Sequence, residues 1–460
     1  MKRSYYFIIP VLGTVFCLWY VFAACSDVIY SDYVRLVNSY LPDVWNPDKF
    51  FVPDVLTRVP VNYLERMINV ELFGYSTMFD RVLGVIGLGL SGFALGIYCK
   101  RKEVGAVWFC LLMAVLFSLN KWEMLVNGSG WVHFMACAGF YYHYLVIDRV
   151  RSGQEKKGDS WRLVILPFFL TILVAGPYCA IYSVAVILTY GFFMVTDFWN
   201  RKKTNLRYGG YALCSLVPLL LYMWSNSYAV EDHAASAKVG LLTQLADTPG
   251  FFVRFFVKSF SSMVVGGERA QEIFTVIQTN APFFILGALV MTAYLLALFL
   301  NFRYRLYEKT VMPLILVVSG GLNHVLILLS RWIFLNEDYG ASSRYALQFQ
   351  IGIIGIIVTF ALVWKEWRKG RQMAVKGAVV GFSLLFLAGN CYTTYYEMKK
   401  APIRKYYTEL RALTALDFEN KTDDELRAAF EYRMSRPESG ALVRQALTIL
   451  KENGWNVFRD

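Results

Sequence analysis

Apolar segments alternate with short, mostly basic loops along most of the 460-residue chain. About eleven apolar segments can be distinguished by this pattern, at residues 5–25, 79–98, 104–119, 131–147, 163–174, 178–195, 208–224, 281–300, 311–329, 346–364 and 378–392. A perpendicular membrane-spanning helix needs about 20 apolar residues, so the shorter segments indicate a local bilayer defect or helices buried inside a bundle. The pattern predicts an all-α polytopic membrane protein of about 11 transmembrane helices.

The basic residues predict how these helices are oriented. With the N-terminus in the cytoplasm, the internal loops hold about twice as many Lys and Arg residues as the longer external loops, in line with the positive-inside rule. Lys399, Lys400, Arg404 and Lys405 follow the last segment and depart from this rule. We expect a multi-pass protein of the plasma membrane, with a cytoplasmic N-terminus and an external C-terminal segment.

The N-terminus also has features of a lipoprotein signal peptide, because Met1-Lys-Arg is followed by an apolar run that ends at Ala24-Cys25. Cleavage there would remove one membrane crossing. The run is long enough to span a bilayer and precedes an external loop. We therefore expect an uncleaved first helix.

Two regions are predicted from the change in composition along the chain. The transmembrane bundle covers residues 1–396, and a helical segment of nearly balanced charge follows at 397–460. Thr422-Asp-Asp-Glu425 has the sequence of a capping box, which indicates a helix start. The external loops of interest are 26–78, 225–280 and 330–345. Helical spacing of apolar residues in the first two predicts amphipathic helices, with Arg254 and Lys258 reaching the membrane interface.

Composition and motifs exclude several classes of protein. The chain is 57% hydrophobic and 17% charged, against roughly 25% charge in soluble domains. Its net charge of +12 follows from the basic internal loops, so no nucleic-acid partner is expected. The eight cysteines form no CxxC pair, and no nucleotide-binding motif is present. No cofactor is assigned, and a divalent metal is left open because the four histidines and the scattered acids show no recognisable ligand spacing.

Two aspartates open the first external loop, in the sequence Cys25-Ser-Asp27-Val-Ile-Tyr-Ser-Asp32-Tyr-Val-Arg35. They are five residues apart, so a continuous helix would point them in different directions. Ser31-Asp32 suits a helix N-cap, which gives Asp32 a structural interpretation. The functional alternative for Asp32 is a general base at the boundary between membrane and water.

Other polar side chains fall at the predicted external ends of the segments. The candidates for substrate binding are Glu123, His133, His233, His324 and Tyr345. Taken singly, a histidine at a helix end usually packs against its neighbours. Taken together with the nearby arginines, these residues form one charged layer, which transfer of a group from a phosphate-bearing lipid requires.

Arginine can bind such a phosphate through bidentate hydrogen bonds that partial desolvation strengthens. Arg344 enters an otherwise apolar segment and is the first candidate for this role. Arg331 is the second, with an interfacial anchor as its structural alternative. Metal ligands are not identified in this layer.

In topology the chain resembles the GT-C superfamily of integral-membrane glycosyltransferases. The resemblance lies in the first helix, the long first external loop with early aspartates, the number of segments and the external C-terminal segment. The break at Ala175-Gly-Pro-Tyr178 and the sequence Ser-Ser-Arg344-Tyr345 are similar to bacterial surface-polysaccharide members. No paired Asp-Asp or Asp-Glu motif occurs in the first external loop.

This resemblance implies a GT-C-like bundle that transfers a sugar from a polyprenyl-phosphate donor to a surface or lipid-linked glycan acceptor. The acidic position of the family corresponds to Asp32 first and Asp27 second, acting as base in an inverting displacement. Arg344 and Arg331 would bind the donor phosphate, and membrane lipid would surround the protein. Trp45, Trp122 and Trp332 are candidates for stacking on sugars, with an interfacial belt as their structural alternative.

The sequence leaves two other functions open. An O-antigen-type polysaccharide polymerase or ligase also acts on lipid-linked glycans, and it places its chemistry in a large late external loop. Here loop 225–280 carries Glu231, Asp232, His233, Arg254 and Lys258. A lipid or glycan transporter would need charges at the bilayer midplane and an internal repeat, and the sequence shows little of either.

Overall fold

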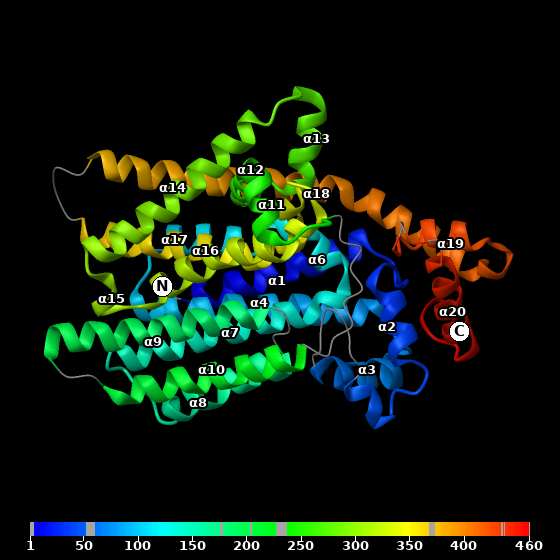
Figure 1. Ribbon diagram of the computed structural model, residues 1–460, viewed down its shortest axis with the longest axis horizontal. Helices are drawn as coiled ribbons and strands as arrows, with labels where there is room; N and C mark the ends of the chain where they lie inside the picture. Colours follow the sequence, from blue (N-terminus) through cyan, green and yellow to red (C-terminus); the bar gives the residue numbers. More distant parts are fainter. Residues whose placement is uncertain are drawn as a thin grey trace.

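The computed structural model describes residues 4–51, 60–174, 178–202, 205–226, 237–367, 373–433, 436 and 438–459. Throughout these ranges the secondary structure consists of helices and turns, with no strand (Figure 1). Nine described helical spans are long and apolar enough to cross a membrane. The prediction of an all-α polytopic membrane protein is confirmed.

A helix forms at each of the predicted apolar segments. The bundle helices are α1 (Tyr5–Ala24), α4 (Thr77–Lys102), α5 (Ala106–Leu116), α7 (Trp131–Arg151), α8 (Asp159–Phe168), α9 (Cys179–Arg201), α10 (Leu206–Asn226), α14 (Ala281–Arg303), α16 (Met312–Arg331), α17 (Ala346–Glu366) and α18 (Met373–Leu416). Successive helices run in opposite directions along the long axis of the molecule (Figure 1). Helices α7 and α8 are the two that the nine candidate spans do not include.

Helix α17 lies at the centre of the bundle, because almost all of its residues are buried and nearly all of these are apolar. A helix that is apolar all round is typical of the core of a bundle. It packs on α16 through two glycines: a Cβ added to Gly320 would lie 2.2 Å from the Cα of Gly352. Small residues of this kind let two membrane helices approach closely.

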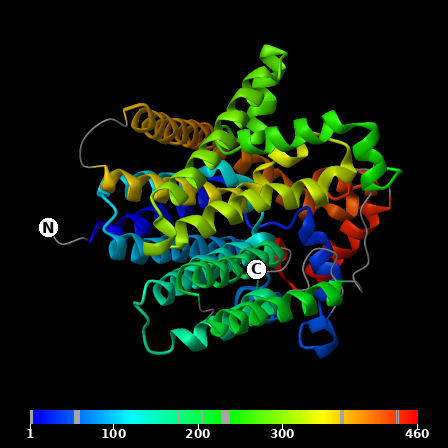
Figure 2. The same cartoon turned by 60° about the vertical axis from the view of Figure 1, so that its left-hand side comes forward.

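Short helices gather at one end of the bundle, which we call the α2 end (Figure 1). They include α2 (Asp32–Tyr40), α3 (Pro60–Phe73), α6 (Trp122–Val126), α11 (Leu241–Asp247), α12 (Pro249–Ser261) and α13 (Gly267–Ile277). The predicted loop helices are therefore present. Figure 2 shows that the corner between α13 and α14 projects from the bundle.

Lys258 departs from its prediction as a residue that reaches the membrane interface. Its side chain is only 4% exposed, and its Nζ lies 2.6 Å from Glu337 and 2.8 Å from Asp338. Arg254 also pairs with Glu337, at 2.6 Å. Two carboxylates in the loop after α16 thus attract these cations toward the protein, and the cations fix α12 to that loop.

The C-terminal region is continuous with the bundle. Helix α18 has 44 residues and runs through the predicted boundary at 396–397, with Pro402 inside it. It leads to α19 (Asp423–Ala429), which begins with the predicted capping box at Thr422 and Glu425, and to α20 (Ser439–Glu452). These helices share a second hydrophobic core with α2 and α3, separate from the core of the bundle.

Ion pairs join the basic loops at the opposite end. Asp148 is buried and pairs with Arg101 and Lys102, and it also accepts hydrogen bonds from the amides of Val311 and Met312. A carboxylate at the first amides of α16 stabilises the start of that helix. Asp148 thus serves the packing of the bundle.

Candidate functional site

Asp32 is the first residue of α2, and the chain reaches it through a buried segment that follows α1. Ser31, the N-cap residue, has a φ of 50° and makes no side-chain capping bond. Asp32 is partly buried, and its carboxylate forms no hydrogen bond or ion pair with the described part of the chain. The oxygens of Asp32 are therefore available to another group.

Glu123 and Arg344 lie beside Asp32. Arg344 Nε is 2.5 Å from Glu123 Oε1, and both residues interact electrostatically with Asp32. Glu123 belongs to α6 and Arg344 to the 3₁₀ turn η8 (Ser343–Tyr345), which packs on α6. The Arg344 side chain is 42% exposed, so a ligand can reach its guanidinium. We call these three residues the Asp32–Glu123–Arg344 site.

Asp27, in contrast, is occupied with structural contacts. Its Oδ1 accepts hydrogen bonds from the Thr77 amide and hydroxyl, both at 2.7 Å, and its Oδ2 accepts one from the Ser76 hydroxyl at 2.6 Å. Asn456 Nδ2 adds a further donor at 3.2 Å. The carboxylate thus caps the start of α4, and this geometry favours Asp32 over Asp27 as a base.

A second set of polar residues, not expected from the sequence, adjoins this site. Glu268 on α13 accepts hydrogen bonds from the Ser343 amide at 3.0 Å and the Ser343 hydroxyl at 2.9 Å, next to Arg344. Its other oxygen accepts one from Trp122 Nε1 at 3.4 Å. The guanidinium of Arg404 lies over the Trp122 ring, 3.6 Å from its centroid. These contacts bring α6, α13 and α18 together.

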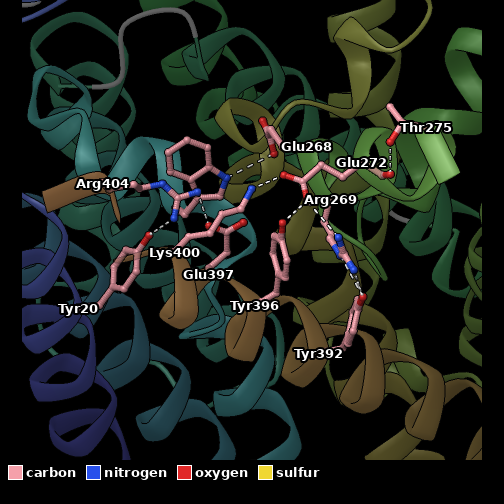
Figure 3. Close-up of polar contacts among 11 residues, drawn as sticks. Tyr20, Glu268, Arg269, Glu272, Thr275, Tyr392, Tyr396, Glu397, Lys400 and Arg404 are labelled. Atoms are coloured by element: carbon pink, nitrogen blue, oxygen red, sulfur yellow. Dashed lines mark hydrogen bonds and ion pairs between the residues drawn. The ribbon is translucent and has the colours of Figure 1, made fainter. Parts of the chain in front are cut away.

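Figure 3 shows how α18 carries this network along its length. Arg404 lies 2.5 Å from the buried Glu397 and donates to Tyr20 at 3.2 Å. Glu272 accepts hydrogen bonds from Lys400, Tyr396 and Arg269.

Burial opposes the ionisation of Glu272. The hydrogen bonds from Lys400, Tyr396 and Arg269 outweigh that effect and lower the pKa of the carboxyl. Glu397 and Glu272 thus pair with two of the basic residues that departed from the positive-inside rule, Arg404 and Lys400.

The predicted histidines are spread over different environments. His324 is fully buried between the rings of Phe260 and Phe349, at 3.7 and 3.8 Å, and its Nδ1 contacts the Ser259 hydroxyl. This packing favours a structural role for His324, and its role as a substrate-binding residue stays a prediction. His133 on α7 lies against the ring of Tyr178, at 4.1 Å. His233 lies outside the described residues.

Arg331 and Tyr345 lie close to each other beside the site. Arg331 ends α16, and its guanidinium is 6.0 Å from the ring centroid of Tyr345, which is buried in η8. Arg331 Nε is buried and has no hydrogen-bond partner in the described ranges. The structure therefore pairs Glu123 with Arg344 within electrostatic range of Asp32, and it places Arg331 near Tyr345, the residue that follows Arg344.

The three candidate tryptophans lie in different environments. Trp45 is exposed and donates to Glu71, Trp332 is buried near Phe252, and Trp122 is the one that reaches the site network. Within the described residues, no group of three or more His, Cys, Asp or Glu side chains could hold a metal ion. The site carboxylate Glu123 is paired with an arginine.

The fold and these contacts define an α-helical multi-pass membrane protein with a charged site at one end of its bundle. Comparisons of the chain with protein-family models, with curated proteins and with solved structures found no match. The function is therefore argued from the site.

Proposed function

We propose that this protein is a glycosyltransferase that moves a sugar from a polyprenyl-phosphate donor to a glycan acceptor at the external face of the plasma membrane. The supporting observation is the Asp32–Glu123–Arg344 site, where a carboxylate without a partner in the described chain lies beside an accessible arginine. The site lies at the end of an apolar bundle, where a lipid phosphate would meet water. In the proposed orientation the N-terminus is cytoplasmic and the α2 end is external.

In the proposed reaction Asp32 removes the proton from an acceptor hydroxyl. The acceptor oxygen attacks the anomeric carbon, and the bond from that carbon to the phosphate oxygen breaks. The configuration inverts, the polyprenyl phosphate leaves with the bonding electron pair, and the proton stays on Asp32. Arg344 stabilises the charge that develops on the phosphate, and Arg331 lies close enough to the site to assist.

Glu123 prepares Arg344 for this role. The 2.5 Å ion pair holds the guanidinium in place before the donor binds, which lowers the entropic cost of binding. It also neutralises a charge that is partly removed from water. A guanidinium has five N–H donors, so the donor phosphate could share the four that remain on Arg344 besides the Nε–H bonded to Glu123.

The alternative of an O-antigen-type polymerase or ligase has less support from the geometry. It would use polar residues of loop 225–280, of which Arg254 and Lys258 are engaged with Glu337. The acids at 231 and 232 lie outside the described residues. Among the described residues, no comparable site favours a transporter.

The test uses purified protein in lipid nanodiscs with radiolabelled polyprenyl-phosphate sugars. Turnover or hydrolysis of a donor by the wild type, and its loss in Asp32→Asn, is the expected result. Asp43→Asn is the matched control, because Asp43 is an exposed acid of the same loop. Full activity in Asp32→Asn would refute Asp32 as the base. Failure to bind any polyprenyl phosphate would refute the proposed donor.

A further inference from the structure

Glu268 connects the two chain segments that carry the ion pair of Glu123 and Arg344. Its Oε1 accepts hydrogen bonds from the amide and the hydroxyl of Ser343, the residue that precedes Arg344. Its Oε2 accepts one from Nε1 of Trp122, the residue that precedes Glu123. A single carboxylate is thus bonded to the immediate neighbour of each partner in the pair.

Helix α13 is held in place where it presents Glu268. A Cβ added to Gly267 would lie 1.9 Å from the carbonyl oxygen of Ala341, so the start of α13 packs directly on the turn that precedes η8. The amide of Gly266 donates a hydrogen bond to the Thr393 hydroxyl on α18, at 3.2 Å. Contacts with two other elements therefore fix the backbone of Glu268.

The ion pair depends on this support. The Arg344 side chain is 42% exposed, and an ion pair with that exposure contributes little to holding two segments together. Ser343 is 1% exposed, so water does not replace the hydrogen bonds that its amide and hydroxyl donate to Glu268. Hydrogen bonds to a carboxylate are also stronger than those between neutral groups. We therefore expect Glu268 to fix the position of Arg344 more firmly than the ion pair does.

Ser343 lies between the two carboxylates. Its hydroxyl oxygen is 2.9 Å from Glu268 Oε1 and 3.4 Å from Glu123 Oε2. A hydroxyl has one proton to donate, and the shorter distance assigns that proton to Glu268. Glu123 is thereby left to accept its hydrogen bond from Arg344.

We propose that Glu268 is a positioning residue of the proposed active site, which holds Arg344 where the phosphate of the lipid donor binds. It acts through Ser343 and Trp122, which engage both of its oxygens. This inference rests on the proposed function, in which Arg344 binds that phosphate. It also makes loop 225–280, which contains Glu268, a part of the same site as Asp32.

The experiment measures binding of bare undecaprenyl phosphate to the full-length protein in nanodiscs. Glu268→Ala should weaken binding about tenfold, because Arg344 is no longer held in place. Glu268→Gln keeps an oxygen that can accept both hydrogen bonds from Ser343, so this conservative variant should bind within about threefold of wild type.

Glu272→Ala is the matched control for Glu268→Ala. Glu272 lies one turn further along α13, and in the described chain its carboxylate accepts hydrogen bonds from α13 and α18, away from η8 and α6. Three hydrogen bonds are lost in either alanine variant. Binding to Glu272→Ala should stay within about twofold of wild type, because the loss does not reach Arg344.

A double-variant cycle separates positioning from a general structural role. Arg344→Gln alone should weaken binding, and adding Glu268→Ala should weaken it no further, because Glu268 acts through Arg344. Effects of the two substitutions that multiply would overturn the positioning role. Equal binding by wild type and a folded Glu268→Ala protein would overturn it as well, and would leave the proposed function intact.

A second variant covers the case in which Glu268→Ala does not fold. Ser343→Ala combined with Trp122→Phe removes two of the same three hydrogen bonds and should weaken binding severalfold. Unchanged binding in that variant would overturn the positioning role. Wild-type protein that binds no undecaprenyl phosphate would overturn the proposed function and this inference together.

Discussion

Asn456 donates a hydrogen bond to Asp27 Oδ1 at 3.2 Å, across 429 residues of sequence. Its Nδ2 also donates to the Tyr75 carbonyl at 3.0 Å, and its Oδ1 accepts from the Ile29 amide at 3.3 Å. The last turn of the described chain therefore holds the segment that leads from α1 to Asp32. Asn456 has a φ of 56°, a conformation that asparagine tolerates better than most residues.

We expect Asn456→Ala to lower the stability of the protein by about 2–3 kcal/mol, because three hydrogen bonds of a buried side chain are lost. Thermal unfolding in detergent would measure this change. Asn453→Ala is the control, since Asn453 is exposed and bonds only to its own helix. Equal unfolding temperatures for the two variants would show that Asn456 does not anchor the loop.

Substitutions of the two aspartates of the first loop should differ in their effects on stability and on turnover. Asp27→Asn replaces a carboxylate that accepts from Ser76 and Thr77, so we expect a loss of about 1–3 kcal/mol. Asp32 makes no such bonds in the described chain, so Asp32→Asn should leave the unfolding temperature unchanged and abolish turnover. A destabilised Asp32→Asn protein would instead assign Asp32 a structural role.

The pair formed by Lys258 and Glu337 predicts a pH dependence of stability. Burial opposes ionisation of Glu337, but hydrogen bonds from Lys258 and Arg254 outweigh it and lower the pKa of this carboxyl. A lowered pKa in the folded state means that its contribution to stability is present above about pH 4.3, the unfolded value, and is lost as the pH falls through the folded value. The contribution should therefore be complete at pH 7.

Unfolding temperatures measured from pH 7 to pH 3 would test this. Glu337→Gln should be less stable than wild type at pH 7, by about 1–2 kcal/mol, and the gap should narrow below about pH 4. Glu366→Gln serves as the control, because its ion pair with Lys309 is exposed and contributes little at any pH. A gap that stays constant over the whole range would contradict the assigned ion pairs.

The positions of the bundle helices could be predicted from hydropathy, since the bilayer requires long apolar helices with internal hydrogen bonds. The length of α18 could not be predicted from hydropathy. Its apolar part ends near Tyr392, and the helix continues to Leu416 with exposed polar and basic residues that resemble a loop in composition. Packing against α1 and the pairing of Arg404 with Glu397 support this continuation.

The candidate site was predictable only in part. Asp32, Glu123 and Arg344 were expected in one layer because each follows or precedes a membrane segment on the same side. Glu268 was missed, since its position depends on how the long loop 225–280 folds, and no local pattern in the sequence reports that. His324 was interpreted as a site residue because polar residues near a helix end suggest function, yet two aromatic rings enclose it.

The close contact of Gly352 on α17 with Tyr294 on α14 provides the last prediction. A Cβ on Gly352 would lie 1.8 Å from the Tyr294 hydroxyl and 2.5 Å from its ring, so Gly352→Ala forces the tyrosine or the helices to move. We expect a loss of about 1–3 kcal/mol from overpacking. Gly191→Ala is the matched control, because nothing lies within 4 Å of a Cβ there, and alanine is the better helix former.

Thermal unfolding of the two alanine variants in parallel distinguishes the packing effect from helix propensity. The unfolding temperature should fall for Gly352→Ala and stay equal or rise for Gly191→Ala. An unchanged unfolding temperature for Gly352→Ala would mean that Tyr294 packs less closely on α17 than in this structure.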